Sequence, residues 1–331
     1  MLSFAKSKFL STGAPALTIT DKDYVCSLCG DFGPGEVLMA LSVGTQFNGY
    51  IDFTGYTYTA FRAPALVTAS GNISFRNNAS LAAVDMRAVV TGGGDFWGCN
   101  LNGPNVNLSA LTTVDNQQLY LAHMPSMTAA PSMPNLTTMN RAIVFSQNYN
   151  MAGTGGSSTL TAMHHEYELD YTKVTSISFP ALTTITSVGA FPCGILGGGD
   201  LSVVGGVGKS PCASLSTPEL TNLSGSTINI ADTSTSAGFT TWTYNTSKWL
   251  TLGNHFNITL SRNMMTTATM NALLAHLASI ANTAPSFYTD TGTGADYPYN
   301  TIDLRFQSNS QTPSDTTSIN ALTALNISVL T

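Results

Sequence analysis

A short phrase returns along the chain, and its return limits the folds that are open to this sequence. The copies read APALVTA from residue 63, LSALTTV from 108, MPNLTTM from 133, FPALTTI from 179 and TPELTNL from 217. Each is followed by a segment in which apolar and polar residues alternate, as at Ile73 and Phe75. Alternation predicts a strand with one buried face, and a recurring phrase predicts a repeat architecture.

The segment after the phrase has a preferred form, in which two alternating apolar residues are followed by Asn at the next bend. The copies of this form are Ile73, Phe75 and Asn78, then Ile143, Phe145 and Asn148, then Ile258, Leu260 and Asn263. We predict that the apolar pairs point inward and stack on neighbouring passes, while each Asn bonds backbone groups that the bend leaves unpaired. After Ile228 the Asn position holds Thr233, and IDLRFQ at 302–307 lacks Asn.

The wording P-x-L-T-x-I resembles the leucine-rich-repeat family, and in particular the receptor L-domain type of surface and phage proteins. The resemblance covers about residues 60–310. It implies a curved stack of parallel strands whose exposed faces bind protein or sugar ligands, usually without catalysis. The expected fold class is mainly β: a leucine-rich-repeat-like solenoid with parallel strands, irregular Gly-rich insertions and a C-terminal α/β cap.

The two ends of the chain differ from its repeating middle, and the terminal repeats of such folds need caps. We predict an N-terminal cap or attachment segment at 1–45 and the solenoid at 46–263. Residues 264–331 would form a C-terminal capping helix and the last coil, including the strand TIDLRF. The helix is expected over 264–281, where helical spacing relates Met270, Leu273, Leu274 and Leu277.

Charge limits the partners of the chain. Only 9% of residues are charged, the formal net charge is −6, and the Lys and Arg are scattered. We therefore predict no nucleic-acid partner, because phosphates need a basic surface. No apolar run is long enough to span a bilayer or to serve as a signal peptide. The dispersed Cys26, Cys29, Cys99, Cys193 and Cys212 favour a reducing folding compartment, and the low charge leaves room for a homo-oligomer.

The segment LSVVGGVGKSPC, residues 201–212, fits a phosphate-binding loop only in part. Gly208, Lys209 and Ser210 match the G-x-x-x-x-G-K-[ST] pattern, but Val203 stands where the first Gly is required. No helix is predicted to follow, although such a loop should open one. We interpret LSVV as the alternating segment of one pass and GGVGKSP as the turn that leaves it, so no cofactor is predicted.

Two segments contain possible metal ligands. MHHEYELD at 163–170 holds His164, His165, Glu166, Glu168 and Asp170, and the pair Cys26 and Cys29 has the spacing of half a zinc site. We interpret the first as an exposed polar insertion and the second as an incomplete site. No metal-binding residue is therefore predicted, and metal binding at His164 and His165 or at Cys26 and Cys29 stays open.

Other residues with chemical potential have structural interpretations. The carboxylates of Asp85, Asp95, Asp115 and Asp200 could pair as in a glycosidase, but turns are their commoner place. The indoles of Trp97, Trp242 and Trp249 could stack on sugars or pack in the core. We predict no catalytic residue.

Together these features favour a non-enzymatic virion structural protein of a tailed phage, which decorates the capsid or forms a host-binding element of the tail. The hypothesis rests on the lack of an export signal, a polar uncharged surface and a repeat architecture suited to display. Its partners would be other virion proteins and a host-surface protein or glycan. The alternative is a bacterial cell-surface or secreted adhesin, and a polysaccharide-processing solenoid enzyme ranks third.

Overall fold

The chain divides into two compact units, Met1–Met151 and Ala152–Thr331, called unit 1 and unit 2. The boundary falls inside the segment 46–263 that was predicted as one solenoid. The computed structural model describes residues 29–31, 36–39, 46–47, 50–54, 57–63, 66–187, 194–198, 210–231, 233, 238–253, 256–281, 288–289, 296–297, 300–307 and 309–331. Most of the predicted segment 1–45 therefore lies outside the described residues.

In the described part of unit 1 the strands belong to three sheets, and all pairs are parallel except β1 with β2. The first sheet contains, in order of pairing, β15 (Ile143–Val144), β13 (Leu119–Tyr120), β10 (Gly94–Asp95), β7 (Asn72–Ser74) and β4 (Tyr50–Asp52). The second contains β14 (Thr138–Met139), β12 (Thr113–Val114), β9 (Thr91–Gly92), β6 (Thr68–Ala69) and β3 (Gln46–Phe47). The third contains β1 (Cys29–Asp31), β2 (Glu36–Met39), β5 (Ala60–Arg62), β8 (Ala83–Asp85) and β11 (Val106–Asn107), with the short helix η1 (Gly103–Asn105) before β11.

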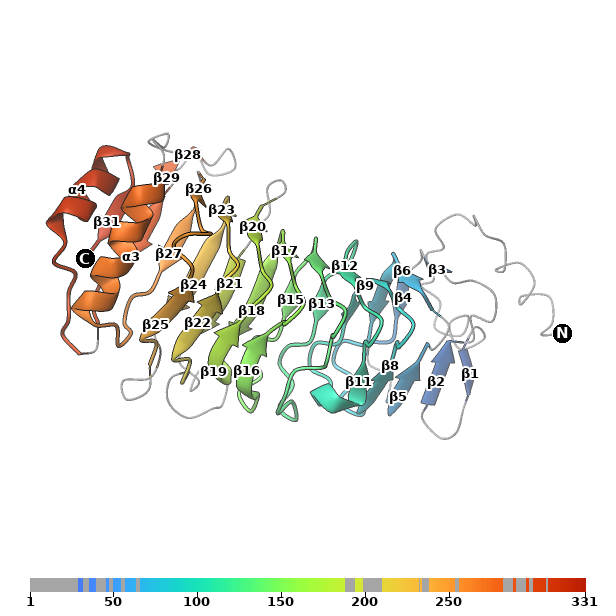
Figure 1. Ribbon diagram of the computed structural model, residues 1–331. Helices are drawn as coiled ribbons and strands as arrows, with labels where there is room; N and C mark the ends of the chain where they lie inside the picture. The colour runs from blue at the N-terminus through green and yellow to red at the C-terminus, as the bar shows by residue number, and fades with distance from the viewer. Residues whose placement is uncertain are drawn as a thin grey trace. The chain divides into compact units, whose positions relative to one another are not determined.

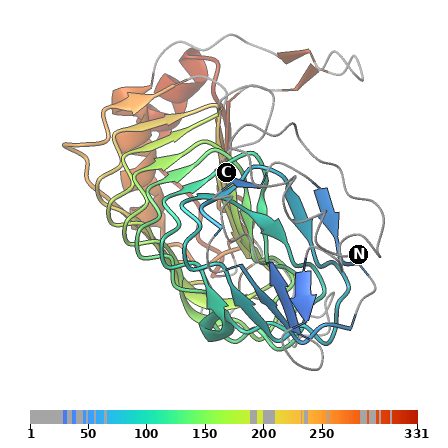
Figure 2. The ribbon, with the colours of Figure 1, turned by 90° about the vertical axis from the view of Figure 1, so that its right-hand side faces the viewer.

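From β3 to β13, successive strands of unit 1 visit the three sheets in turn, and equivalent strands of neighbouring passes pair with each other (Figure 2). β6, β7 and β8 make one pass, and β9, β10 and β11 make the next. Equivalent residues meet in register, as Thr91 does with Thr68 and with Thr113. The recurring phrase supplies β6, β12 and β14 of the second sheet, and the alternating segment supplies β7, β13 and β15 of the first.

The interior of unit 1 holds aromatic rings from successive passes. The ring of Phe75 stacks on Phe53 with centroids 4.5 Å apart and on Phe96 with centroids 5.7 Å apart. All three side chains are fully buried, as is Phe145 further along the first sheet. Each such ring contributes roughly 1.5–3 kcal/mol through removal of its apolar surface from water. The inward apolar positions of the alternating segments thus form the core.

In the described part of unit 2 the strands form three parallel sheets and a separate antiparallel pair. The first sheet contains β18 (Glu166–Asp170), β21 (Gly194–Gly198), β24 (Thr227–Ala231), β27 (Asn257–Thr259), β30 (Thr301–Asp303) and β31 (Ser328–Leu330). The second contains β17 (Ala162–Met163), β20 (Thr184–Thr186), β23 (Asn222–Ser224) and β26 (Thr251–Leu252). The third contains β16 (Ala152–Gly156), β19 (Lys173–Ser178), β22 (Ser214–Thr217) and β25 (Thr241–Tyr244), and the antiparallel pair is β28 (Tyr288–Thr289) with β29 (Asp296–Tyr297).

Two helices lie side by side in unit 2, α3 (Thr267–Ile280) and α4 (Thr316–Ala324) (Figure 1). α3 occupies the segment where the sequence predicted a helix, and it buries Met270, Leu273, Leu274 and Leu277. Its first turn is capped by the Thr266 hydroxyl, which accepts a hydrogen bond of 3.1 Å from Thr269 N. Asp315 caps α4 in the same way through Ser318 N.

Two sequence interpretations in unit 2 were wrong. MHHEYELD is no exposed insertion, because Glu166–Asp170 forms β18 and the alternating Tyr167 and Leu169 point into the core. The strand beside β18 is Gly194–Gly198, although Gly-rich stretches were expected to be irregular insertions. Glycine has weak strand propensity, so composition concealed this strand. The segment LSVV at 201–204 lies outside the described residues.

The chain is mainly β with parallel sheets, as the repeating alternation predicted. Helices are confined to the few segments named above in the part of the chain that the structure describes. None of these helices is long and apolar enough to cross a membrane.

Candidate functional site

Polar side chains at the predicted Asn positions join neighbouring passes inside each unit. In unit 1 the buried Asn148 donates from Nδ2 to Leu121 O at 2.6 Å and accepts from Met124 N at 2.7 Å. In unit 2 Asn263 donates to Ile230 O at 2.5 Å and accepts from the Thr233 hydroxyl at 2.7 Å. The apolar members of the three motifs are all fully buried: Ile73, Phe75, Ile143, Phe145, Ile258 and Leu260.

The remaining motif residue, Asn78, is also fully buried. Its Oδ1 accepts a hydrogen bond of 3.2 Å from Ser80 N, and its Nδ2 has no partner among the described residues. Asn78 thus bonds its own bend, whereas Asn148 bonds the pass before it.

Two residues that sequence reasoning missed occupy the same position in other passes. Gln307 Nε2 donates to Leu260 O at 2.9 Å, and its Oε1 accepts from Met265 N at 3.0 Å. Cys99 Sγ donates to Phe75 O at 3.1 Å, and burial raises the pKa of this thiol to about 12. The signal was the spacing, since both residues follow an inward apolar residue by three positions, as Asn78 follows Phe75.

The residue before each of these positions has a left-handed backbone and lies at the surface. Asn77, His123 and Gln147 have φ values of 61°, 56° and 60°. His123 is exposed, and its Nδ1 lies 3.2 Å from Gln147 Oε1 of the next pass. Three bends of unit 1 therefore present a polar side chain at the surface, whereas the bend before Cys99 has Gly98, with a φ of 71°, at this position.

A cluster on the outer face of the first sheet of unit 1 combines aromatic and charged groups, and we call it the Trp97 column: Arg76, Asp95, Trp97, Tyr120 and His123. The guanidinium carbon of Arg76 lies 5.5 Å from the centroid of the Trp97 ring and 5.9 Å from that of Tyr120. Trp97 stacks on His123, with centroids 4.9 Å apart and planes inclined by 9°. Arg76 Nε lies 3.3 Å from Asp95 Oδ2.

The parallel sheet positions this column. Asp95 and Tyr120 are register partners on β10 and β13, and Arg76 and Trp97 follow the ends of β7 and β10. Trp97 and Tyr120 pack on small side chains that are at most 3% exposed, namely Ala122, Ala142 and Val144. The rings are therefore fixed before any ligand arrives, which lowers the entropic cost of binding.

The Trp97 column is equipped for recognition of another molecule. The side chain of Arg76 is 47% exposed, while Trp97 and Tyr120 are half-buried. Arg, Trp and Tyr are the residue types in which binding energy concentrates at protein interfaces. The Arg76 and Asp95 charges offset each other, so the column offers directional hydrogen bonds and ring faces rather than net charge.

Three carboxylates form a second cluster, in unit 2. Glu166, Glu168 and Asp170 alternate along β18 and share its outer face. Burial and the neighbouring Glu168 raise the pKa of Glu166. Burial, followed by repulsion from Glu168 and Glu166, raises the pKa of Asp170 to about 7. Asp170 can therefore hold a proton near neutral pH.

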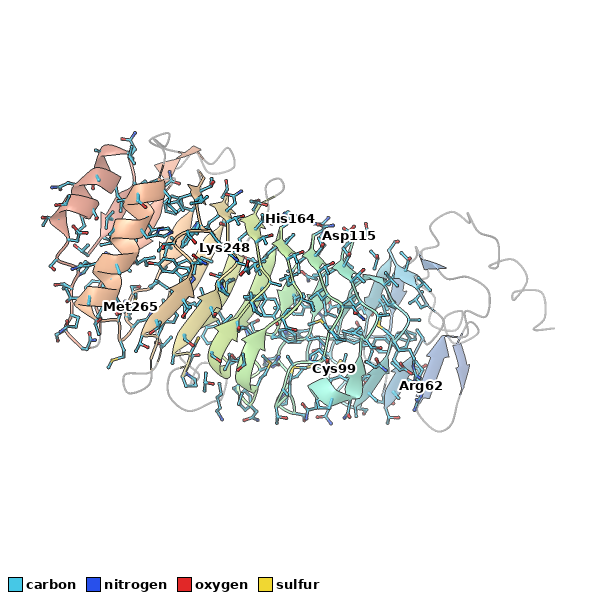
Figure 3. The ribbon with its side chains drawn as sticks, in the orientation of Figure 1. Arg62, Cys99, Asp115, His164, Lys248 and Met265 are labelled. Atoms are coloured by element: carbon cyan, nitrogen blue, oxygen red, sulfur yellow. The ribbon has the colours of Figure 1, made fainter. Side chains whose placement is uncertain are left out.

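The histidines beside these carboxylates bond other groups. His164, which is labelled in Figure 3, has its Nδ1 atom 2.9 Å from Thr186 O. His165 Nδ1 accepts a hydrogen bond of 2.9 Å from Glu166 N. Within the described ranges no group of three or more His, Cys, Asp or Glu side chains is arranged to hold a metal ion. Cys26 and the side chain of Cys29 lie outside the described residues, so metal binding there stays a hypothesis.

Three of the four carboxylates considered for a glycosidase lie among the described residues and have local partners. Asp85 pairs with Arg87, and this hydrogen-bonded guanidinium lowers the pKa of Asp85. Asp115 accepts a hydrogen bond of 2.8 Å from Asn116 N in a turn, and Asp95 belongs to the Trp97 column. Asp200 and residues 201–209 of the phosphate-loop-like segment lie outside the described residues.

The remaining two tryptophans lie close together in unit 2. Trp249 is fully buried and Trp242 is 5% exposed, with ring centroids 5.1 Å apart. Trp242 borders a pocket of about 220 Å³ beside α3.

Comparison of the chain with protein-family models, curated proteins and solved structures finds no significant match.

Proposed function

We propose that the chain is a non-enzymatic structural protein of a tailed-phage virion, either a capsid decoration or a host-binding element of the tail. In this proposal each unit is a leucine-rich-repeat-like solenoid that serves as a rigid scaffold. Parallel pairing of most described strands with their equivalents in the neighbouring pass supports the solenoid. The low charge of the chain supports the virion assignment.

The single observation that carries the binding role is the Trp97 column. Arg76, Trp97 and Tyr120 meet on the outer face of a parallel sheet, on a floor of small buried side chains. Preorganised aromatic and Arg anchors are what a protein partner binds most strongly. We assign this surface of unit 1 to docking on another virion protein.

Mass spectrometry of purified virions whose genome encodes the chain tests the assignment. The chain should be present after washing, and Trp97→Ala should lower its incorporation at least tenfold, as expected for loss of a binding anchor. The matched control is Val90→Ala, which truncates a residue that is 37% exposed and lies outside the column. Both variants are first checked for unchanged thermal unfolding.

Absence of the chain from the particles would contradict the virion assignment, and recovery from washed bacterial cells would then favour the surface adhesin. Presence of the chain with equal incorporation of both variants would instead contradict docking through the Trp97 column.

The carboxylates on β18 favour a second candidate, a polysaccharide-processing enzyme. Alternate residues of a strand lie roughly 7 Å apart, which falls in the range that separates the two carboxyls of inverting glycosidases. Asp170, with its pKa raised to about 7 by burial and by the neighbouring carboxylates, would be the acid. Release of reducing ends from a panel of glycans by the full chain, lost in Asp170→Asn, would establish this activity and overturn the non-enzymatic proposal.

A further inference from the structure

The pocket beside α3 in unit 2 lies between β25 and the first half of that helix. It has a volume of about 220 Å³, and its walls include Trp242 and Tyr244 from β25 and Met265 before α3. Figure 3 shows Met265 beside the N-terminal end of α3. Three hydroxyl side chains, from Thr243, Thr246 and Thr269, also line it.

The lining limits the chemistry of a ligand. None of the residues that line the pocket is acidic, basic or His, so an ionic ligand would lose hydration without gaining a counter-charge. Aromatic rings offer flat apolar faces, and threonine hydroxyls donate and accept hydrogen bonds at the same opening. A neutral sugar ring matches both, because it has an apolar C–H face and a hydroxyl-bearing edge. The pocket is smaller than the roughly 300–1,000 Å³ of sites for drug-sized ligands, which suits one ring of a larger glycan.

The two aromatic side chains of the pocket wall, Trp242 and Tyr244, are fixed by contacts with other residues of unit 2. Trp242 Nε1 donates to the Thr217 hydroxyl at 2.9 Å, and Trp242 packs on Trp249. Tyr244 stacks on His276 with centroids 5.0 Å apart. His276 is 7% exposed, and burial lowers its pKa, so this stack places a neutral ring behind Tyr244 at neutral pH.

One wall has a weak polar contact that a ligand can replace. The Tyr244 hydroxyl donates to Ala272 O at 3.4 Å, near the outer limit for a hydrogen bond. Tyr244 is half-buried, and the neighbouring Thr243 and Thr246 are exposed. A sugar hydroxyl can therefore take the place of Ala272 O as the partner of this phenol without breaking a strong bond.

We propose that this pocket binds a single neutral sugar residue of a glycan. The inference rests on the proposed function, because it names the class of host-surface ligand that a virion attachment protein would bind. It also separates two roles by location, with protein docking at the Trp97 column of unit 1 and glycan binding at the pocket of unit 2.

The test is saturation-transfer-difference NMR of the full chain with neutral monosaccharides, namely glucose, galactose, mannose, rhamnose and N-acetylglucosamine, and with glucuronate as the charged probe. At least one neutral sugar should give a signal and glucuronate should not. Tyr244→Ala should weaken binding at least tenfold. Tyr244→Ala also removes the packing of Tyr244 on His276 and so can lower stability as well as sugar binding. Thr246→Lys is therefore the second variant, because it places a charged side chain at the pocket rim from an exposed position.

Leu250→Ala is the matched control, because Leu250 is 65% exposed in unit 2 and does not line the pocket. Absence of a signal with every neutral sugar, or equal binding by wild type and Thr246→Lys, would overturn the pocket assignment. Incorporation of Thr246→Lys into virions distinguishes the two proposals: unchanged incorporation with lost sugar binding supports both. If the chain is absent from virions but binds a neutral sugar as wild type, the pocket assignment stands and the virion role is contradicted.

Discussion

The side-chain amide of Asn148 donates a hydrogen bond of 2.6 Å to the carbonyl oxygen of Leu121, which belongs to the preceding pass of the chain. The same amide accepts from Met124 N, so one buried side chain satisfies a donor and an acceptor of a bend that the sheets do not pair. This arrangement explains why a polar residue is required in an otherwise apolar interior.

Replacement of Asn148 by Leu should therefore destabilise unit 1 strongly. Leu121 O and Met124 N would lose their partner, and each buried unpaired group costs about 1–3 kcal/mol. We expect the free energy of unfolding to fall by about 2–4 kcal/mol in urea titrations. Asn105→Ala, at an exposed position in η1, is the control and should change it by less than about 0.5 kcal/mol. Equal effects of the two substitutions would contradict this role of Asn148.

Gln307 should behave in unit 2 as Asn148 does in unit 1. Gln307→Leu removes the donor to Leu260 O and the acceptor of Met265 N, and we expect a loss of about 2 kcal/mol or more. The exposed Gln311, which bonds Thr267 at the start of α3, is the matched control. Calorimetry of Gln311→Leu should show a loss below about 1 kcal/mol; a loss as large as that of Gln307→Leu would disprove the assignment.

Two glycines of β16 share a positive φ but differ in the space available for a side chain. Both have positive φ, +90° at Gly153 and +111° at Gly156. A Cβ at Gly156 would lie 2.1 Å from Ser178 O, whereas a Cβ at Gly153 would have no atom within 4 Å. We expect Gly156→Ala to lower the free energy of unfolding by about 1–3 kcal/mol more than Gly153→Ala does. Equal losses in chemical denaturation would show that β16 and β19 do not approach this closely.

Asp170 should give unit 2 a distinct pH dependence. Because its pKa rises from 3.8 to about 7 on folding, the native chain binds a proton that the unfolded chain has released between these values. Stability from this group is present below about pH 4 and is lost as the pH rises through about 7. Asp170→Asn should flatten that fall and raise stability at pH 8 by at least about 1 kcal/mol, since one pKa unit corresponds to about 1.4 kcal/mol.

The control for this pH series is Asp115→Asn, which changes a turn carboxylate of unit 1. Thermal unfolding between pH 4 and 8 should keep the wild-type slope in the control. A wild-type slope in Asp170→Asn would mean that Asp170 ionises normally in the folded chain.

Sequence patterns predicted the features that depend on repetition. The alternating segments located β7, β15 and β27, and helical spacing predicted the segment of α3 to within a few residues. These predictions succeed because inward positions must stay apolar in every pass. The third strand of each pass in unit 1 was not predicted, since β8 and β11 each contribute a single inward residue, Val84 and Val106, and show no alternation.

The candidate sites were harder to predict because they depend on neighbours in space. Trp97 was singled out, but its stack on His123 joins residues from separate passes. Gln307 was overlooked because the motif was defined by Asn, although a longer side-chain amide makes the same bonds. The pocket combines β25 with α3, and no local pattern relates Tyr244 to Thr269.

Electron cryo-microscopy of virions whose genome encodes the chain tests the central claim most directly. The account predicts density for the chain on the capsid or tail, with the Trp97 column against a neighbouring virion protein and the pocket beside α3 open to solvent. Virions that carry the chain with the Trp97 column facing solvent would contradict the docking surface. Virions without density for the chain would contradict its role as a structural component.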